Sequence, residues 1–205
     1  MANTLAPSGF QPSRMMNGSP ALYAMRTFQI AYNNAVKFGK GDPVVLLNTG
    51  YIDRFQKTGE VITGILWGVE YVDPNSGQFT YYPAWLAPTL AATDIVIAHV
   101  IVDPMMLFRV QVSGTALALT NIGNNIDIVS GGSEAPNAKS GMSTCAVLAS
   151  TAATTATLPF RIEGIVGLGD GFERPALYPT YDPSEDNNWV EVRLNTSTLT
   201  STTGI

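Results

Sequence analysis

The sequence contains only one histidine, His99, and only one cysteine, Cys145, in 205 residues. A single cysteine excludes an internal disulfide, and the two side chains together are too few for a structural zinc site. His99 lies in an apolar run, so we expect a buried or half-buried imidazole that makes one backbone hydrogen bond. Cys145 also lies in an apolar run, where a free cysteine usually serves as a small buried hydrophobe.

Catalytic motifs are equally scarce. A hydrolytic site would need His99 as its base, and no serine or cysteine nucleophile lies beside it in the sequence. Ser143 lacks the second glycine of a nucleophile elbow. We therefore predict that the protein is not an enzyme and has no catalytic residue, no metal and no cofactor. A hydrolase with an unrecognised site that depends on His99 remains an alternative.

Charge is also low. Charged residues make up 13% of the chain, against about 25% in typical soluble proteins. The net charge is −5 and the sequence pI is about 4.7, and the sequence has no run of lysine and arginine, so we expect no binding to nucleic acid phosphates. A polar surface with few charges costs little to desolvate, which suits a protein that docks against neighbours.

Long apolar runs are missing as well. No stretch reaches the roughly 18 apolar residues of a membrane span, and no basic segment followed by an apolar one marks a secretory signal. We therefore expect no membrane partner and synthesis in a cytosol.

The abundant pattern is that of short strands separated by glycine and proline turns. We expect an all-β protein with little helix, in which residues 21–194 form a single β-barrel or jelly-roll-like β-sandwich. Long loops are expected at 130–141 and 169–188, and a Ser/Thr-rich tail at 195–205. The best helical candidate is 116–121. The predicted strands are 43–47, 60–71, 78–82, 94–102, 107–112, 125–129, 142–149 and 189–194, and 157–168 is expected to contain a further pair of strands.

Two strands have further signals. Gly64 and Gly68 lie within 60–71 and predict bulges or a bend. The run 94–102 is apolar on both faces, which predicts a strand that is covered on both sides.

Residues 1–20 are expected to form an extended arm. Three prolines in this segment oppose a long helix or a central strand. The segment nevertheless contains Leu5, Phe10, Met15 and Met16, whereas a disordered tail would be poor in such residues. We interpret it as an arm that lies along another surface; the alternative is a lead-in packed on its own domain.

Two other clusters have open interpretations. Tyr81, Tyr82 and Trp85 would serve as an interface anchor, as a sugar-stacking surface together with Tyr178 and Tyr181, or as a plug at a barrel end. The acidic residues Asp182, Glu185 and Asp186 would hold a hard cation or, more simply, form a solvated loop.

The order of several short motifs resembles that of the head-decoration, or capsid cement, proteins of tailed bacteriophages. The resemblance covers residues 1–165 and is absent from Gly169 onward. The motifs are Met1-Ala-Asn-Thr, Ala6-Pro-Ser-Gly-Phe10, Asn17-Gly18, Lys40-Gly-Asp-Pro-Val44, Gly50-Tyr-Ile52, Gly64-Ile-Leu-Trp-Gly-Val-Glu-Tyr71, Tyr82-Pro-Ala-Trp85, Val102-Asp-Pro104, Phe108-Arg-Val-Gln111 and Phe160-Arg-Ile162.

This resemblance implies a β-rich structural virion protein, made in the bacterial cytoplasm, that binds the outer surface of an icosahedral capsid where coat subunits meet. The expected partners are the major capsid protein and further copies of the chain, as a homotrimer or alternatively a dimer. A carbohydrate-binding or host-attachment module on a virion is the alternative. The candidate contact residues are Leu5, Phe10, Arg14, Met15, Met16, Tyr81, Tyr82 and Trp85.

Overall fold

The computed structural model describes residues 3–56, 59–129, 135–168 and 182–201. This part of the chain is nearly all β, as expected, and its only helical elements are the 3-10 turns η1 (Leu119–Asn121) and η2 (Ala149–Thr151). None of its helices has the length and apolar character needed to cross a membrane. The strands are β1 (Gln11–Met15), β2 (Met25–Ile30), β3 (Phe38–Gly39), β4 (Pro43–Leu46), β5 (Ile52–Arg54), β6 (Ile62–Val72), β7 (Phe79–Tyr82), β8 (Ala84–Trp85), β9 (Val96–Ile101), β10 (Met106–Ser113), β11 (Asn125–Ile126), β12 (Val147–Leu148), β13 (Phe160–Ile165) and β14 (Trp189–Leu194).

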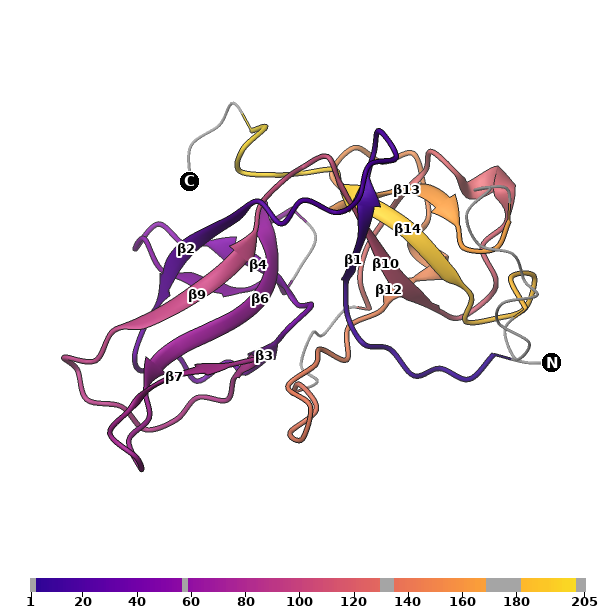
Figure 1. Cartoon of the computed structure of the whole chain (residues 1–205). Coiled ribbons are helices and arrows are strands. Elements are labelled where there is room, and N and C mark those ends of the chain that lie inside the picture. The colour runs from indigo at the N-terminus through magenta and orange to yellow at the C-terminus, as the bar shows by residue number, and fades with distance from the viewer. Residues whose placement is uncertain (1–2, 57–58, 130–134, 169–181, 202–205) are drawn as a thin grey trace.

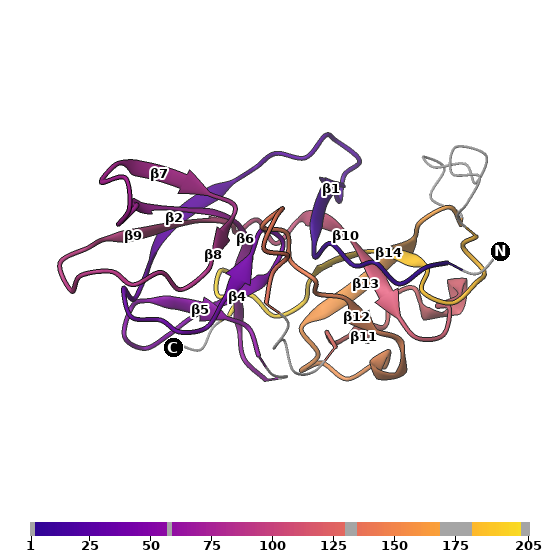
Figure 2. The ribbon, with the colours of Figure 1, turned by 90° about the horizontal axis from the view of Figure 1, so that it is seen from below.

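The strands form two barrel-like lobes that lie side by side (Figures 1 and 2). The insert lobe contains β2 to β9, and its main sheet has the antiparallel order β2-β9-β6-β4-β5, with β7 on β6. A bridge between Gln29 and Tyr51 joins the two end strands of this sheet. The short pair β3-β8 completes the lobe.

The main lobe contains β1 and β10 to β14. Its sheet has the order β1-β10-β14-β13-β11. Strand β12 pairs in parallel with the end of β10, and a bridge between Ile128 and Val147 returns from β12 to the chain just after β11. The free side of β10 is therefore shared by β1 at its start and β12 at its end.

The chain path divides the span that was expected to be one domain. It begins in the main lobe with β1, builds the whole insert lobe, and returns to the main lobe at β10. The described part of residues 21–194 thus contributes to two main sheets and the short β3-β8 pair, and residues 11–15 of the predicted arm belong to one of the main sheets. Residues 11–15 can form a strand although they contain Pro12, because β1 lies at an edge of the sheet. An edge strand accepts proline, whereas a central strand does not.

Two hydrophobic cores hold the lobes together. One cluster fills the insert lobe and includes Trp85 and Phe38. The other fills the main lobe and also contains residues from the insert lobe, so apolar packing continues across the junction. These insert-lobe residues are Val45, Phe55, Ile62, Ile65 and Ile101.

The predicted irregularities of β6 are confirmed. Its register against β4 shifts next to Gly64, and its register against β9 shifts next to Gly68. A side chain at Gly64 would collide with the carbonyl of Ile101, and one at Gly68 would collide with the ring of Tyr81. Both glycines are therefore required by close approach of neighbouring groups.

The prediction that the run 94–102 is covered on both sides holds only at the end of the run. Val96, Ala98 and Val100 are buried in the insert-lobe core, whereas Ile97 and His99 are only half-buried and Ile95 is 60% exposed. On this second face of β9 only Ile101 is fully buried, because the main lobe packs against the end of the strand and leaves its start and middle open.

Candidate functional site

The N-terminal segment, Asn3 to Met16, lies along the chain's own main lobe. Ala6 N donates to Gln111 Oε1 at 2.9 Å, and Gln111 Nε2 donates to the carbonyl of Thr4 at 2.8 Å. Gln111 is buried, although its alternation in β10 predicts an outward position. The segment itself covers this outward face of β10.

The start of the segment is also tied to the chain that precedes β14. Asn3 Nδ2 donates to the carbonyl of Asp182 at 2.8 Å, and Asp182 N donates back to Asn3 Oδ1 at 3.1 Å. Asn187 Nδ2 donates to the carbonyl of Asn3 at 3.3 Å. These side-chain and backbone bonds fix residues that would otherwise be a free terminus.

Two predicted anchors belong to the protein's own core. Phe10 stacks on Phe160 with ring centroids 4.3 Å apart and is 1% exposed, and Met15 is 8% exposed. Strand β1 places them by pairing antiparallel with residues 106–109 of β10. Neither side chain reaches a partner while β1 stays paired, so this part of the segment follows the alternative of a lead-in packed on its own domain.

Arg14 is also engaged within the chain. Its Nε donates to Glu191 Oε2 at 3.0 Å, and Ser13 Oγ donates to the other oxygen, Glu191 Oε1, at 2.5 Å. Glu191 is buried, and a buried carboxylate requires such partners. Among the predicted anchors of the segment, only Leu5 and Met16 are exposed.

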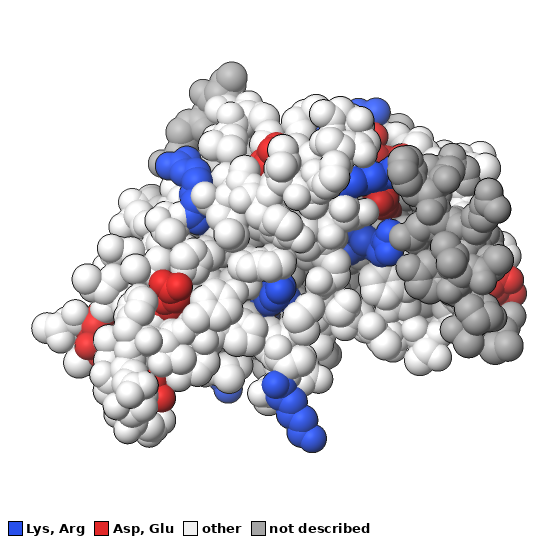
Figure 3. Space-filling model, viewed as in Figure 1, with Lys and Arg blue, Asp and Glu red and all other residues white. Residues whose placement is uncertain are grey.

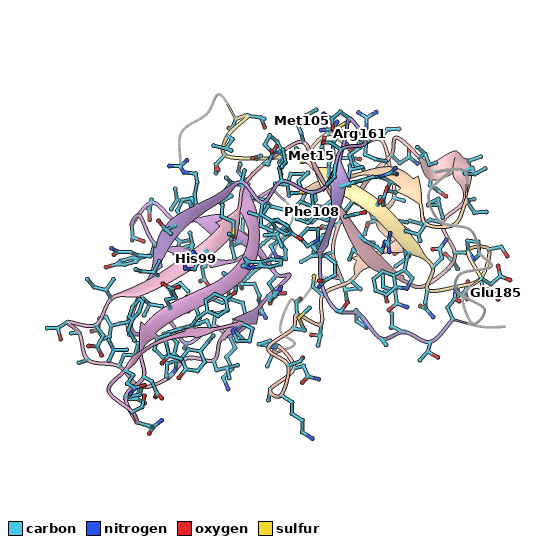
Figure 4. The ribbon with its side chains drawn as sticks, in the orientation of Figure 1. Met15, His99, Met105, Phe108, Arg161 and Glu185 are labelled. Carbon is cyan, nitrogen blue, oxygen red and sulfur yellow. The ribbon has the colours of Figure 1, made fainter. Side chains whose placement is uncertain are left out.

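Met16 belongs to a larger exposed apolar surface near the junction of the lobes. The connection between β1 and β2 exposes Leu22 and Tyr23, the first residue of β2 exposes Met25, and the corner between β9 and β10 exposes Met105. Met16 N donates to the carbonyl of Met105 at 2.9 Å, which brings the two segments together. Figure 4 shows Met105 beside Met15 at this corner. We call this the connection surface; its residues are Met16, Leu22, Tyr23, Met25 and Met105.

The aromatic cluster separates into a buried and an exposed part. Trp85 is fully buried, and its Nε1 donates to the carbonyl of Asn34 at 3.0 Å. Tyr82 is half-buried and stacks on Tyr71 with centroids 4.8 Å apart. These two residues act as the core plug that the sequence left as one interpretation, and only Tyr81 is exposed.

Tyr81 lies across the outward side of the insert-lobe sheet. Its hydroxyl donates to the carbonyl of Trp67 at 3.0 Å, and its ring centroid is 6.2 Å from that of His99. His99 Nε2 lies 3.2 Å from Glu70 Oε1. The imidazole therefore faces a carboxylate on the neighbouring strand, where the sequence predicted a backbone partner.

The remaining candidate nucleophiles lie at the junction of the lobes. Asp42 is buried and accepts hydrogen bonds from Ser143 Oγ at 2.5 Å and from Gly39 N at 2.7 Å. Desolvation raises the pKa of Asp42 despite these bonds and the nearby Arg54. Burial likewise raises the pKa of the Cys145 thiol well above its usual value, with the charges of Asp42 and Asp127 adding to the effect. Cys145 packs against the main-lobe core, whereas His99 faces Glu70 and Tyr81 in the insert lobe.

Asp182 and Asp186 before β14 accept hydrogen bonds from other parts of the protein itself, one within a local turn and one from a distant segment. Asp182 Oδ1 accepts bonds from the backbone and hydroxyl of Ser184, and Asp186 Oδ1 accepts one from Ala116 N. Glu185 lies at the far end of the main lobe in Figure 4. Within the described ranges, no group of three or more His, Cys, Asp or Glu side chains is arranged to hold a metal ion. Tyr178 and Tyr181 lie outside the described residues.

No family model, no curated protein and no solved structure matches this chain.

Sequence reasoning missed the exposed residues that lie between the predicted strands. Leu22 and Tyr23 precede β2, a strand that the sequence did not predict. Met105 lies in the turn between β9 and β10, where the sequence predicted a turn and no exposed contact residue. Ile95 was assigned to a covered face. The sequence held one signal for Ile95. The run 94–102 is apolar on both faces, and covering both faces would require further apolar elements from the rest of the chain.

Proposed function

We propose that the protein is a structural virion protein that binds the outer surface of an icosahedral phage capsid and stabilises it by bridging coat subunits. The observation that carries this proposal is the connection surface, where five large apolar side chains are exposed at the corner between the lobes. Contiguous exposed apolar surface is typical of docking sites. The order of sequence motifs and the low charge support the same conclusion.

The role of the N-terminal segment in this proposal is narrower than the sequence suggested. Phe10, Arg14 and Met15 hold the segment to the main lobe, while Leu5 and Met16 supply exposed contacts along it. A segment that is already ordered loses little conformational entropy when it binds, so its contacts retain more of their free energy. Tyr81 is the exposed contact candidate of the insert lobe.

The proposed partners are the major capsid protein and other copies of this chain, as a homotrimer or alternatively a dimer. Several weak contacts held in one oligomer would bind a shell much more tightly than any one of them alone. The proposal places the protein on the outside of the virion after synthesis in the bacterial cytoplasm, without nucleic acid or membrane partners.

Co-sedimentation with empty shells of the coat protein tests the proposal. Leu22→Asp places a charge on the most exposed residue of the connection surface, 64% exposed, and we expect it to weaken shell binding by about tenfold or more, equivalent to about 1.4 kcal/mol. Leu119→Asp is the matched control, because Leu119 is 54% exposed on η1 of the main lobe. Equal binding by the two variants, or no binding by the unmodified protein, would contradict the proposal.

The carbohydrate-binding alternative now depends on Tyr81, since Trp85 is in the core. Tyr81→Ala is therefore the appropriate test, whereas Trp85→Ala would remove a fully buried core side chain and destabilise the whole fold by about 3–5 kcal/mol. Glycan binding by the isolated protein that is lost in Tyr81→Ala with the fold intact would favour this alternative. The hydrolase alternative would need an activity that His99→Ala abolishes.

A further inference from the structure

The outward side of the insert-lobe sheet presents a contiguous apolar face. Across the ladder, Val72 pairs with Phe79, and Glu70 pairs with both Tyr81 and Ile97. Residues that pair in an antiparallel ladder place their side chains on the same face. Phe79 is 59% and Ile95 60% exposed, and Val72 and Tyr81 are also exposed. We call this the outer face; its apolar residues are Val72, Phe79, Tyr81, Ile95 and Ile97.

One edge of this face is an unpaired strand. Strand β7 pairs with β6, and it has no second partner strand among the described residues. Asp73 N donates to the carbonyl of Gln78 at 2.9 Å, so alternation along the ladder turns the backbone groups of Thr80 and Tyr82 toward β6. The backbone groups of Phe79 and Tyr81 then point away from the sheet. An edge with exposed apolar side chains is a template for another strand.

The charges around the outer face have one dominant sign. Glu70 lies within it, and Asp73 and Asp94 flank the ends of β6 and β9. Hydrogen bonds from Asn75, its backbone N–H first, and from Ser76 lower the pKa of Asp73 below its ordinary value. Strands β6, β7 and β9 contain no lysine or arginine. Figure 3 shows both red and blue patches on this lobe, and Lys40, whose Nζ lies 3.4 Å from the centre of the Trp67 ring, is the cation beside β6. Natural edge strands are commonly protected by lysine, which β7 does not have.

We propose that the β7 edge accepts an extended segment of a partner protein, added as a further strand, with apolar side chains flanked by lysine or arginine. The backbone groups of Phe79 and Tyr81 would pair with the segment, and the outer face would bury its apolar side chains. Its basic ends would meet Asp73, Asp94 and Glu70. A second copy of this chain is a poorer occupant, since two acidic faces would repel each other. This proposal does not depend on binding to a capsid.

A direct test uses the full-length protein, labelled for NMR, and two synthetic peptides of about eight residues, the length of a long strand. Both have alternating valine and threonine in the centre; one is flanked by lysines and the other by glutamates. We expect the lysine peptide to shift the amide signals of Phe79 and Tyr81, to slow their hydrogen exchange, and to bind at least about tenfold more tightly than the glutamate peptide. Absence of binding, or equal binding of the two peptides, would overturn the proposal.

Paired variants separate the backbone contribution from the side chain. Phe79→Ala removes the ring and keeps the outward N–H, whereas Phe79→Pro removes both and is tolerated at an edge position. We expect the proline variant to lose hydrogen-exchange protection at Tyr81 and to bind about tenfold more weakly than the alanine variant.

Tyr81→Lys serves as a second variant that leaves the β7 backbone unchanged. It should weaken binding of the lysine peptide and strengthen binding of the glutamate peptide. Unchanged affinities for both peptides would contradict the charge argument. Concentration-dependent self-association through the same residues in sedimentation experiments would identify a second copy as the occupant and would also overturn the proposal.

Discussion

At the residue scale, buried polar side chains hold the N-terminal segment in place on the main lobe. Gln111 holds the N-terminal segment through two hydrogen bonds, and Glu191 binds Arg14 and Ser13 from the same side of the sheet. Both look like outward positions in an alternating strand. They are buried because the N-terminal segment covers them, and a buried polar group without partners would cost about 1–3 kcal/mol.

Asp42 should make the stability of the protein depend on pH. Its pKa in the folded protein is raised by desolvation above the ordinary value of 3.8. Its contribution to stability is therefore fully present below pH 3.8 and is lost as the pH rises through the raised value. Asp42→Asn cannot ionise, so we expect its free energy of unfolding to rise relative to the unmodified protein over this interval.

Urea denaturation at a series of pH values measures this difference. Comparing the variant with the unmodified protein cancels the effects of carboxylates elsewhere, such as Glu163 beside Arg193. A difference that stays constant as the pH rises would mean that Arg54 and Ser143 stabilise the Asp42 carboxylate as much as burial opposes it, and a difference that falls would mean that they stabilise it more.

At the element scale, the N-terminal segment that the sequence predicted as one arm has two parts with different roles. Residues 3–8 lie on the surface of the main lobe, while β1 completes the sheet, and Phe10, just before β1, and Met15, at its end, belong to the core. Pro12 is tolerated because β1 is an edge strand, and the register shifts between Pro12 and Arg14. A deletion of the whole arm therefore changes the core as well as the surface.

Two truncations should distinguish these roles. Deleting residues 2–8 removes Leu5 and the bonds to Gln111, and we expect a folded protein with modestly lower stability. Deleting residues 2–15 also removes Phe10, and loss of a buried phenylalanine side chain alone costs about 3–5 kcal/mol. That cost is comparable to the total stability of many domains, about 5–15 kcal/mol.

Hydrogen exchange of the β10 amides and urea denaturation measure the outcome. The longer truncation should lose protection at residues 106–109, which pair with β1, and should unfold or aggregate. Equal stability of the two truncated proteins would show that Phe10 and Met15 do not contribute to the core in solution.

At the scale of the whole molecule, two barrel-like lobes share one apolar junction. The main-lobe core includes five side chains from the insert lobe, among them Phe55 and Ile101. The chain also crosses the junction through backbone bonds, as where Lys40 N donates to the carbonyl of Gly141 at 3.0 Å and Ser143 N donates to the carbonyl of Lys40 at 2.9 Å. The lobes therefore hold the connection surface and the outer face in a fixed relation.

We expect the two lobes to unfold as one cooperative unit, because unfolding of either lobe would expose side chains that belong to the shared core. Incorporation of 5-fluorotryptophan provides fluorine NMR signals for Trp67 and Trp85 in the insert lobe and for Trp189 in the main lobe. The three signals should show the same urea midpoint, and Trp189→Phe identifies the signal of the main lobe. Separate midpoints would mean that the junction contributes little to stability.

The sequence by itself determined the fold class, most strand positions and the irregularities of β6. These depend on local patterns: alternation of apolar residues, glycine and proline turns, and glycines within a long β-branched run. The sequence also offered a core position as one interpretation of Trp85, and it indicated that residues 1–20 are too apolar for a free tail.

The tertiary structure alone decided which apolar residues are covered. Phe10 and Met16 flank β1 and look equivalent in the sequence, yet Phe10 stacks on Phe160 in the core and Met16 is exposed. The division into two lobes, the burial of Gln111 and the open outer face beside β7 likewise depend on contacts between residues far apart in the chain. Burial is a property of the whole packed molecule, so no local pattern can specify it.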